Sequence, residues 1–178
     1  MGGTLHNNSG FTLVEIITSI VIMAIIGVIA GVGLSKIATG YVLSKKNTEI
    51  AQHGQIAITR LRKEFRAIKS ISNGAVSTLT YKRLNQTVTQ DVSICWSGTE
   101  SSPLLLKMNA VDCTGGDILI DKVKLFRLNY CGTSSCSGSY LPGTTSIIEV
   151  TLELIGYDNT RIIIAGPDRV VLSPGDEG

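Results

Sequence analysis

Glu15 is a lone carboxylate at the entrance of a long apolar stretch. No charged residue follows it from Ile16 to Leu34, a run of 19 residues. A carboxylate at the centre of a bilayer costs roughly 2.5 kcal/mol or more, and it costs less near the interface. The dipole of a helix that begins here would offset about 0.3–1 kcal/mol. We therefore expect a second, cationic partner for Glu15, although an incidental acid at a helix start is the alternative.

The four cysteines, Cys95, Cys113, Cys131 and Cys136, all follow the apolar stretch. An even number of cysteines beyond such a segment indicates disulfides in an oxidising compartment. Cys131 and Cys136 enclose small, turn-forming residues, which favours a local bridge and leaves Cys95 and Cys113 for the other. Three connectivities stay open, as do free buried thiols. A zinc site is also open, although the spacings are not Cys-x2-Cys and no His is near.

Side chains for catalysis are few. The only histidines are His6 and His53, so a Ser–His–Asp arrangement in the C-terminal region would have no histidine to use. Asp112, Asp117 and Asp121 do not follow a calcium-loop pattern. We predict no enzymatic activity, no cofactor and no metal. The net charge of +2 and an aromatic content of 5% give no reason to assign a nucleic-acid partner.

The apolar stretch has the length of a membrane-spanning helix, which needs about 20 residues. A cleaved signal peptide is the alternative, but the preceding residues contain no Lys or Arg and the apolar core is long. Lys36, Lys45 and Lys46 on the C-terminal side favour an N-out orientation. The cysteines instead favour an oxidising compartment on that side.

A helical pattern continues beyond the apolar stretch. Apolar or small residues recur three and four positions apart at Ile50, Gly54, Ala57, Ile58, Leu61, Phe65, Ile68 and Ile71. This spacing predicts one amphipathic face. Gly74 suits a helix C-terminus. We expect one helix from about Phe11 to Ser72, roughly 90 Å long.

After Gly74 the apolar period changes to two, which predicts strands. We expect strands at 77–82, 87–95, 104–108, 118–130, 146–154 and 160–165. The strand 146–154 should place Glu149, Thr151 and Glu153 on a polar face. A bulge is expected between Leu125 and Phe126. The predicted fold is α+β, in which the amphipathic half of the helix packs on a C-terminal antiparallel sheet.

Gly10 followed by the residues FTLVE and the apolar run resembles the prepilin signature of type IV pilins and type II secretion pseudopilins. The resemblance implies that a prepilin peptidase cuts between Gly10 and Phe11 and methylates the new amine of Phe11. It makes Glu15 the glutamate that is the fifth residue of the mature chain in this family. This glutamate would pair with that amine, in a neighbouring subunit or the same chain, and select the assembly register. Gly27 and Gly31 would allow close helix packing.

Residues 51–68 and two late strands are similar to minor pilins of the W type and minor pseudopilins of the J type. The leader lacks the usual basic residues, and glycines replace the proline common in the apolar helix. The resulting division is 1–10 leader, 11–35 transmembrane, 36–74 amphipathic helix and 75–178 periplasmic or extracellular β-domain.

The resemblance implies a structural, minor fibre subunit that initiates or assists assembly. Its expected partners are prepilin peptidase, other pilins or pseudopilins in a helical fibre, and inner-membrane lipid before assembly. The alternative is a single-pass membrane protein whose β-domain binds a partner and never polymerises.

Overall fold

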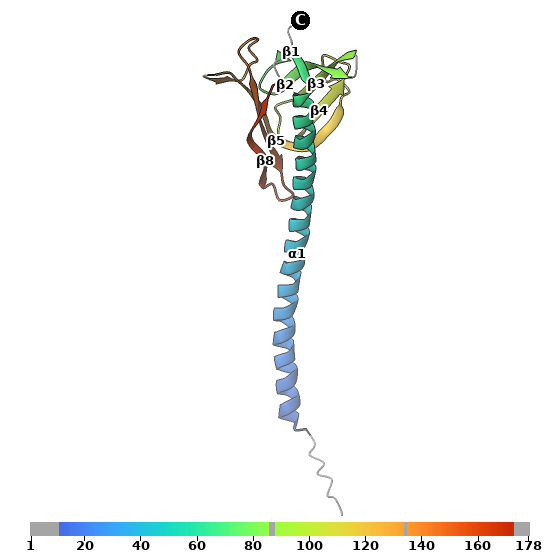
Figure 1. Cartoon of the computed structure of the whole chain (residues 1–178). Coiled ribbons are helices and arrows are strands. Elements are labelled where there is room, and N and C mark those ends of the chain that lie inside the picture. Colours follow the sequence, from blue (N-terminus) through green and yellow to red (C-terminus); the bar gives the residue numbers. More distant parts are fainter. Residues whose placement is uncertain (1–10, 86–87, 134, 173–178) are drawn as a thin grey trace, which may run out of the picture. The chain divides into compact units, whose positions relative to one another are not determined.

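The computed structural model describes residues 11–85, 88–133 and 135–172, which form one helix and one antiparallel sheet (Figure 1). Helix α1 spans Leu13–Arg66. The strands are β1 (Ile68–Gly74), β2 (Thr78–Asn85), β3 (Val88–Trp96), β4 (Ser102–Met108), β5 (Asp117–Cys131), β6 (Cys136–Ser137), β7 (Ile147–Ile155) and β8 (Arg161–Val171). The strand order is β1-β2-β3-β4-β5-β7-β8, with β6 paired to β5. The fold is α+β, as predicted.

The chain divides into two compact units, Met1–Ser44 and Lys45–Gly178. In the first unit, the described residues form the N-terminal part of α1. The second unit contains the rest of α1 and the whole sheet. The curled sheet of this second unit packs against the C-terminal turns of α1 (Figure 1).

The end of α1 differs from the prediction. The helix was expected to continue to about Ser72, but it ends at Arg66, and Ile68–Gly74 forms strand β1 against β2. The spacing of Ile68 and Ile71 fits a helix face, but as a strand this segment gains a backbone ladder with β2. Isoleucine and serine are also weaker helix formers than the residues of the preceding turns. Ile68 is buried in the strand, and the helical pattern also placed it on the buried face, so the apolar pattern alone did not discriminate between helix and strand.

The six predicted strands are present, with all ends but one displaced by one or more residues, and β1 and β6 were not predicted. The bulge in β5 lies at Lys124, between the pairs Val123–Leu154 and Leu125–Glu153, which is just before the predicted position. Strand β8 runs to Val171 because Gly166 and Pro167 form an irregularity after which pairing with β7 resumes. Proline is tolerated there because β8 is an edge strand.

The core lies between the C-terminal turns of α1 and the concave face of the sheet. Ala57, Ile58, Leu61 and Phe65 of α1 are each at most 1% exposed. From the sheet, the fully buried side chains include Leu79, Tyr81, Ile94, Leu104, Leu106, Phe126, Leu128, Ile148 and Leu152. The amphipathic pattern therefore correctly predicted which side of α1 is buried up to Phe65.

Gly54 sets the closest approach between α1 and the last two strands. A Cβ atom at this position would lie 2.6 Å from Ile164 Cδ1 and Cγ1, and 2.9 Å from Leu154 Cδ1. Leu154 is completely buried. A side chain at position 54 would therefore have to displace the side chains of Ile164 and Leu154 or move the helix away from β7 and β8.

We predict that Gly54→Leu lowers the free energy of unfolding of the second unit by about 1–3 kcal/mol, because overpacking exceeds the gain in helix propensity. Thermal unfolding followed by circular dichroism of the full chain in detergent measures this. Gly40→Leu is the matched control, since no atom lies within 4 Å of a Cβ built there. Equal unfolding temperatures for both variants would contradict the packing role of Gly54.

A buried polar cluster joins the last turns of α1 to β2. Glu64 is 7% exposed and accepts hydrogen bonds from Tyr81 Oη at 3.0 Å and from Arg83 Nη1 at 3.0 Å. Arg83 Nη2 donates to Gln90 Oε1 at 3.2 Å. Burial, together with the neighbouring Glu64 carboxylate, raises the pKa of Tyr81. Tyr81 therefore acts as a neutral donor that helps to hold a buried carboxylate.

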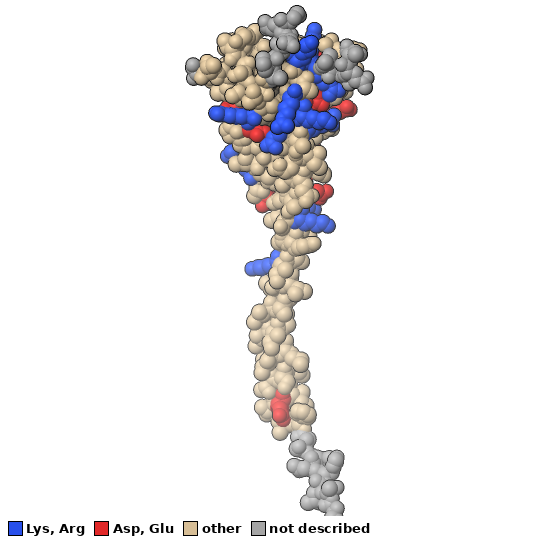
Figure 2. All heavy atoms as spheres, in the orientation of Figure 1, with Lys and Arg blue, Asp and Glu red and all other residues tan. Residues whose placement is uncertain are grey.

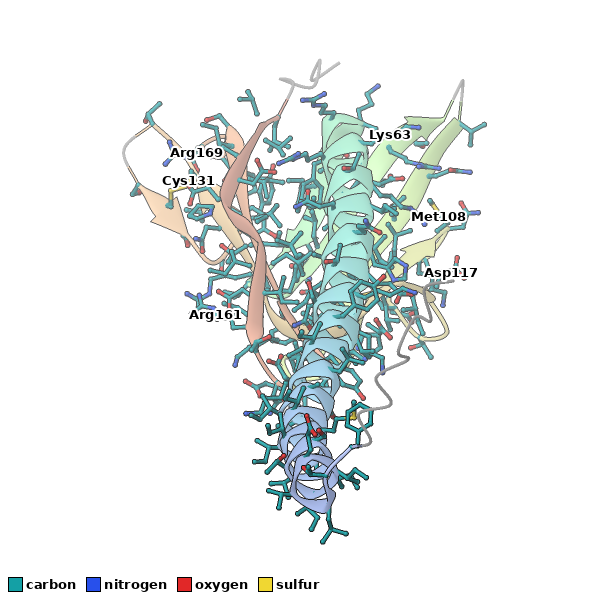
Figure 3. All side chains as sticks on the ribbon, turned by 90° about the horizontal axis from the view of Figure 1, so that it is seen from below. Lys63, Met108, Asp117, Cys131, Arg161 and Arg169 are labelled. Atoms are coloured by element: carbon teal, nitrogen blue, oxygen red, sulfur yellow. A yellow bond between two sulfur atoms is a disulfide. The ribbon has the colours of Figure 1, made fainter. Side chains whose placement is uncertain are left out.

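The predicted polar face of β7 is largely buried. Glu149 and Glu153 are 8% and 5% exposed. Arg169 Nε donates to Glu149 Oε1 at 2.7 Å, and Arg161 pairs with Glu153. Figure 3 shows Arg161 and Arg169 on the side of the sheet away from α1. The arginine side chains of β8 cover these acids, which alternation within one strand cannot reveal.

Two disulfides, Cys95–Cys113 and Cys131–Cys136, join the four cysteines in the pairing that the local spacing favoured.

The Cys131–Cys136 disulfide lies beside the point where the sheet curls back on itself. Val76 O accepts from Leu128 N at 2.7 Å, and Gly74 O accepts from Tyr140 N at 3.0 Å. Tyr130 Oη also donates to Ala75 O at 3.2 Å. These contacts connect the β1–β2 turn to the end of β5.

The β7–β8 turn docks on α1 at the start of the second unit. Tyr157 N donates to Asn47 Oδ1 at 2.8 Å, and Lys46 Nζ lies 3.7 Å from the centroid of the Tyr157 ring. A hydrogen bond from Thr160 lowers the pKa of Asp158 in the same turn. The turn at residues 156–159 is thus also a contact with the helix.

Candidate processing and assembly site

The start of α1 places Glu15 in its first turn. Thr12 N donates to Glu15 Oε2 at 3.4 Å, and Glu15 N donates to Thr12 Oγ1 at 3.4 Å. This reciprocal pair is a capping box, in which a Thr and a Glu three residues later satisfy each other's backbone N–H groups. Thr12 was not predicted as a capping residue, although its T-x-x-E spacing to Glu15 signals one. Both contacts are long for hydrogen bonds, so the cap holds Glu15 weakly.

The hydroxyl groups that follow Glu15 bond within the helix. Thr18 Oγ1 donates to Val14 O at 3.0 Å, and Ser19 Oγ donates to Glu15 O at 2.7 Å. Such back-bonding removes the need for an external partner in an apolar layer. In the described residues from Phe11 to Ser35, Glu15 is therefore the one side chain whose charge has no compensating ion.

The N-terminal part of α1 presents its side chains outward. All residues from 11 to 42 are exposed, including Phe11 at 81% and Ile29 at 69%. The helix contains a segment long and apolar enough to cross a membrane. An apolar surface of this kind requires lipid or other protein around it. Figure 2 shows an acidic side chain near the start of this segment, and the sequence has no other Asp or Glu from 11 to 42.

The structure leaves the two glycines of the predicted packing step without a contact. No atom lies within 4 Å of a Cβ built at Gly27 or Gly31. Both positions are therefore free to approach a second helix, and their packing role stays a prediction. Phe11, on one side of the predicted cleavage point, is among the described residues. Gly10, on the other side, and His6 of the leader lie outside them.

Comparison with known families places a motif on this segment. Residues 5–31 match the prokaryotic N-terminal methylation motif, and the match includes Gly10, Phe11 and Glu15. This match supports a pilin- or pseudopilin-type subunit. A comparison with curated proteins finds no match to the chain. For a pilin-type subunit the motif implies processing by prepilin peptidase, and the exposed apolar helix is consistent with membrane anchoring.

The arrangement at this end of the chain suits binding rather than catalysis. The Glu15 carboxylate is exposed, lies at the surface of an apolar helix and has weak local contacts. A cationic group from a neighbouring chain can therefore reach it without breaking strong bonds. An ion pair formed in an apolar layer is strongly position-dependent, because a displaced partner leaves a charge uncompensated.

Asp112, Glu149 and the cysteine sulfurs of the second unit are used within the fold. Asp112 accepts from Thr114 N at 3.1 Å and pairs with Lys107 at 3.3 Å. These contacts lower the pKa of Asp112. Cys131, Cys136 and Glu149 lie close together, but the two sulfurs form a disulfide, and thiolate is the form that binds metals. These groups therefore have structural explanations.

Proposed function

We propose that the chain is a minor structural subunit of a type IV pilus or a type II secretion pseudopilus, of the W or J type, that acts in fibre initiation or assembly. Prepilin peptidase removes residues 1–10 as a leader and methylates the amine of Phe11. Residues 11–35 then anchor the subunit in the inner membrane, and the β-domain lies in the periplasm until the subunit enters the fibre.

The observation that carries this proposal is the match of the methylation motif to residues 5–31, at the start of the exposed apolar part of α1, in which Glu15 is the one acid. In a protein anchored only in lipid, this carboxylate would serve only as a weak helix cap, at the cost of placing a charge at this depth. A polymer subunit has one, because the methylated amine of a neighbour remains cationic and can neutralise it. The two-disulfide domain fits an oxidising compartment.

Glu15 has two successive partners in this proposal. In the isolated subunit its carboxylate caps the helix through Thr12 N. On assembly it pairs with the amine of Phe11, from a neighbouring subunit or from the same chain, which sets the axial register. Gly27 and Gly31 allow neighbouring apolar helices to approach closely. The partners are thus prepilin peptidase, other pilins or pseudopilins, and inner-membrane lipid before assembly.

Co-expression with a prepilin peptidase tests the processing step. We expect the intact mass of the purified chain to correspond to loss of Met1–Gly10 and gain of one methyl group. Gly10→Leu is the matched control, because it changes the residue at the cleaved bond and should retain the full-length mass. A wild-type chain that keeps its first ten residues would refute the proposal and favour a single-pass membrane protein that binds partners without polymerising.

A further inference from the structure

Lys and Arg are unevenly distributed along the chain. Residues 60–83 contain seven of the 16 Lys and Arg and one of the 14 Asp and Glu. The rest of the chain therefore carries more acidic than basic residues. The single acid of this segment, Glu64, is buried and paired with Arg83, so it does not neutralise the surface. The segment covers the last turns of α1, β1 and most of β2.

The cations of this segment lie on the surface. We define the basic patch as Arg60, Arg62, Lys63, Arg66 and Lys69, all of which are exposed. Figure 2 shows Lys and Arg side chains gathered on the second unit. Among the described residues, Arg62 is the one member with an ion pair, and the other four have no acidic partner.

One nitrogen of the Arg62 guanidinium group is bonded within the fold, and the other two are available to a ligand. Its Nε donates to Asp168 Oδ2 at 2.6 Å, while no bond to its two terminal nitrogens is present in the described part of the chain. Arg62 and Arg66 are four residues apart, so their Cα atoms differ by about 6 Å along the helix. Both line a hollow of about 360 Å³ between α1 and strand β8. Two adjacent guanidinium groups beside a hollow suit oxyanions, which arginine binds with paired N–H groups.

The side chains around the basic patch favour a phosphate-bearing polymer over a protein as its binding partner. The large apolar side chains of residues 60–83 are mostly buried, and Val76 is the exposed one among those described. The anchors of protein interfaces are enriched in Trp, Tyr and Arg, and this patch supplies arginines but no exposed aromatic side chain. Single-stranded nucleic acid would require exposed aromatic rings for base stacking, and Tyr81 is fully buried. A double helix needs only cations for its backbone.

The helix dipole accounts for part of the charge only. Lys63 and Arg66 lie in the last turn of α1, where cations are favourable by about 0.3–1 kcal/mol each. Arg60 lies before this turn and Lys69 is in β1, so the helix dipole does not explain the charge at either position.

We propose that the basic patch binds the phosphodiester backbone of double-stranded nucleic acid. This inference goes beyond the proposed assembly function and is measured without a fibre.

The test uses the full chain in a non-ionic detergent with a fluorescent duplex DNA oligonucleotide, followed by anisotropy at several salt concentrations. The patch variant is Arg60→Gln/Lys63→Gln/Arg66→Gln, which removes exposed, unpaired cations and keeps helix-forming residues. The control is Lys45→Gln/Lys122→Gln/Lys124→Gln, which changes the net charge equally at other positions. Circular dichroism melting verifies that both variants fold, and Arg66→Gln alone is a milder substitute.

We expect the wild type and the control variant to bind with a steep salt dependence. The patch variant should bind roughly a hundredfold more weakly at 0.1 M salt and lose up to about 3 from the slope of log K against log salt. Equal losses in the two triple variants would overturn the proposal, since net charge alone would explain them. It would also be overturned if the patch governed binding to phosphatidylglycerol vesicles or to a second copy of the chain, with no binding to duplex DNA.

Discussion

Glu15→Gln is expected to leave membrane insertion intact and to reduce incorporation into a fibre at least tenfold. Glutamine keeps the capping interaction with Thr12, because either Glu or Gln can serve in a capping box. It cannot compensate the cationic amine of Phe11, which would remain an unpaired charge in a low dielectric. The measurement is the ratio of the subunit in sheared fibres to that in the membrane fraction.

Two further variants separate charge from capping. Glu15→Leu removes both and should be excluded from the fibre as strongly as Glu15→Gln. Thr12→Ala removes one side of the cap and keeps the charge, so it should cost about 1 kcal/mol of local helix stability and still assemble. Normal incorporation of the glutamine variant, together with failure of Thr12→Ala, would assign Glu15 to helix capping and refute the register role.

Glu64→Leu is expected to lower the free energy of unfolding of the second unit by about 3 kcal/mol. Removing one partner of a buried ion pair leaves the other charge uncompensated, which costs about 3–5 kcal/mol, and the 21% exposure of the Arg83 side chain favours the low end. Arg83 Nε already has no hydrogen-bond partner among the described residues, so Arg83 has little alternative bonding. Urea unfolding followed by the fluorescence of Trp96, the only tryptophan, measures the change.

The double variant Glu64→Leu/Arg83→Leu provides the control for this prediction. When both charges are replaced by apolar side chains, most of the lost stability should return, because no buried charge remains. The hydroxyl group of Tyr81 would then lack an acceptor, and Tyr81→Phe in the same background should recover part of the remainder. A double variant as unstable as Glu64→Leu would show that shape, rather than charge compensation, explains the effect.

The sequence by itself determined the features that depend on neighbouring residues. The run after Glu15 is apolar on every side, so no arrangement of the rest of the chain was needed to predict an exposed, membrane-competent helix. The alternation in β7 and the turn after it were likewise local. The stripe from Gly54 to Phe65 correctly predicted the buried face of α1, because a period of three and four residues is a property of the helix itself. The capping residue Thr12 was also readable from its spacing to Glu15, but it was overlooked.

The tertiary structure decided what depended on distant residues. The helix ends at Arg66 because Ile68–Gly74 finds hydrogen-bonding partners in β2, and that gain does not appear in the apolar pattern of the segment. Glu149 and Glu153 are buried because arginines of the next strand cover them, and Glu64 is buried because Tyr81 and Arg83 satisfy it. In each case the free energy of burying a charge or ending a helix depends on side chains brought close only by folding, so no local pattern could predict it.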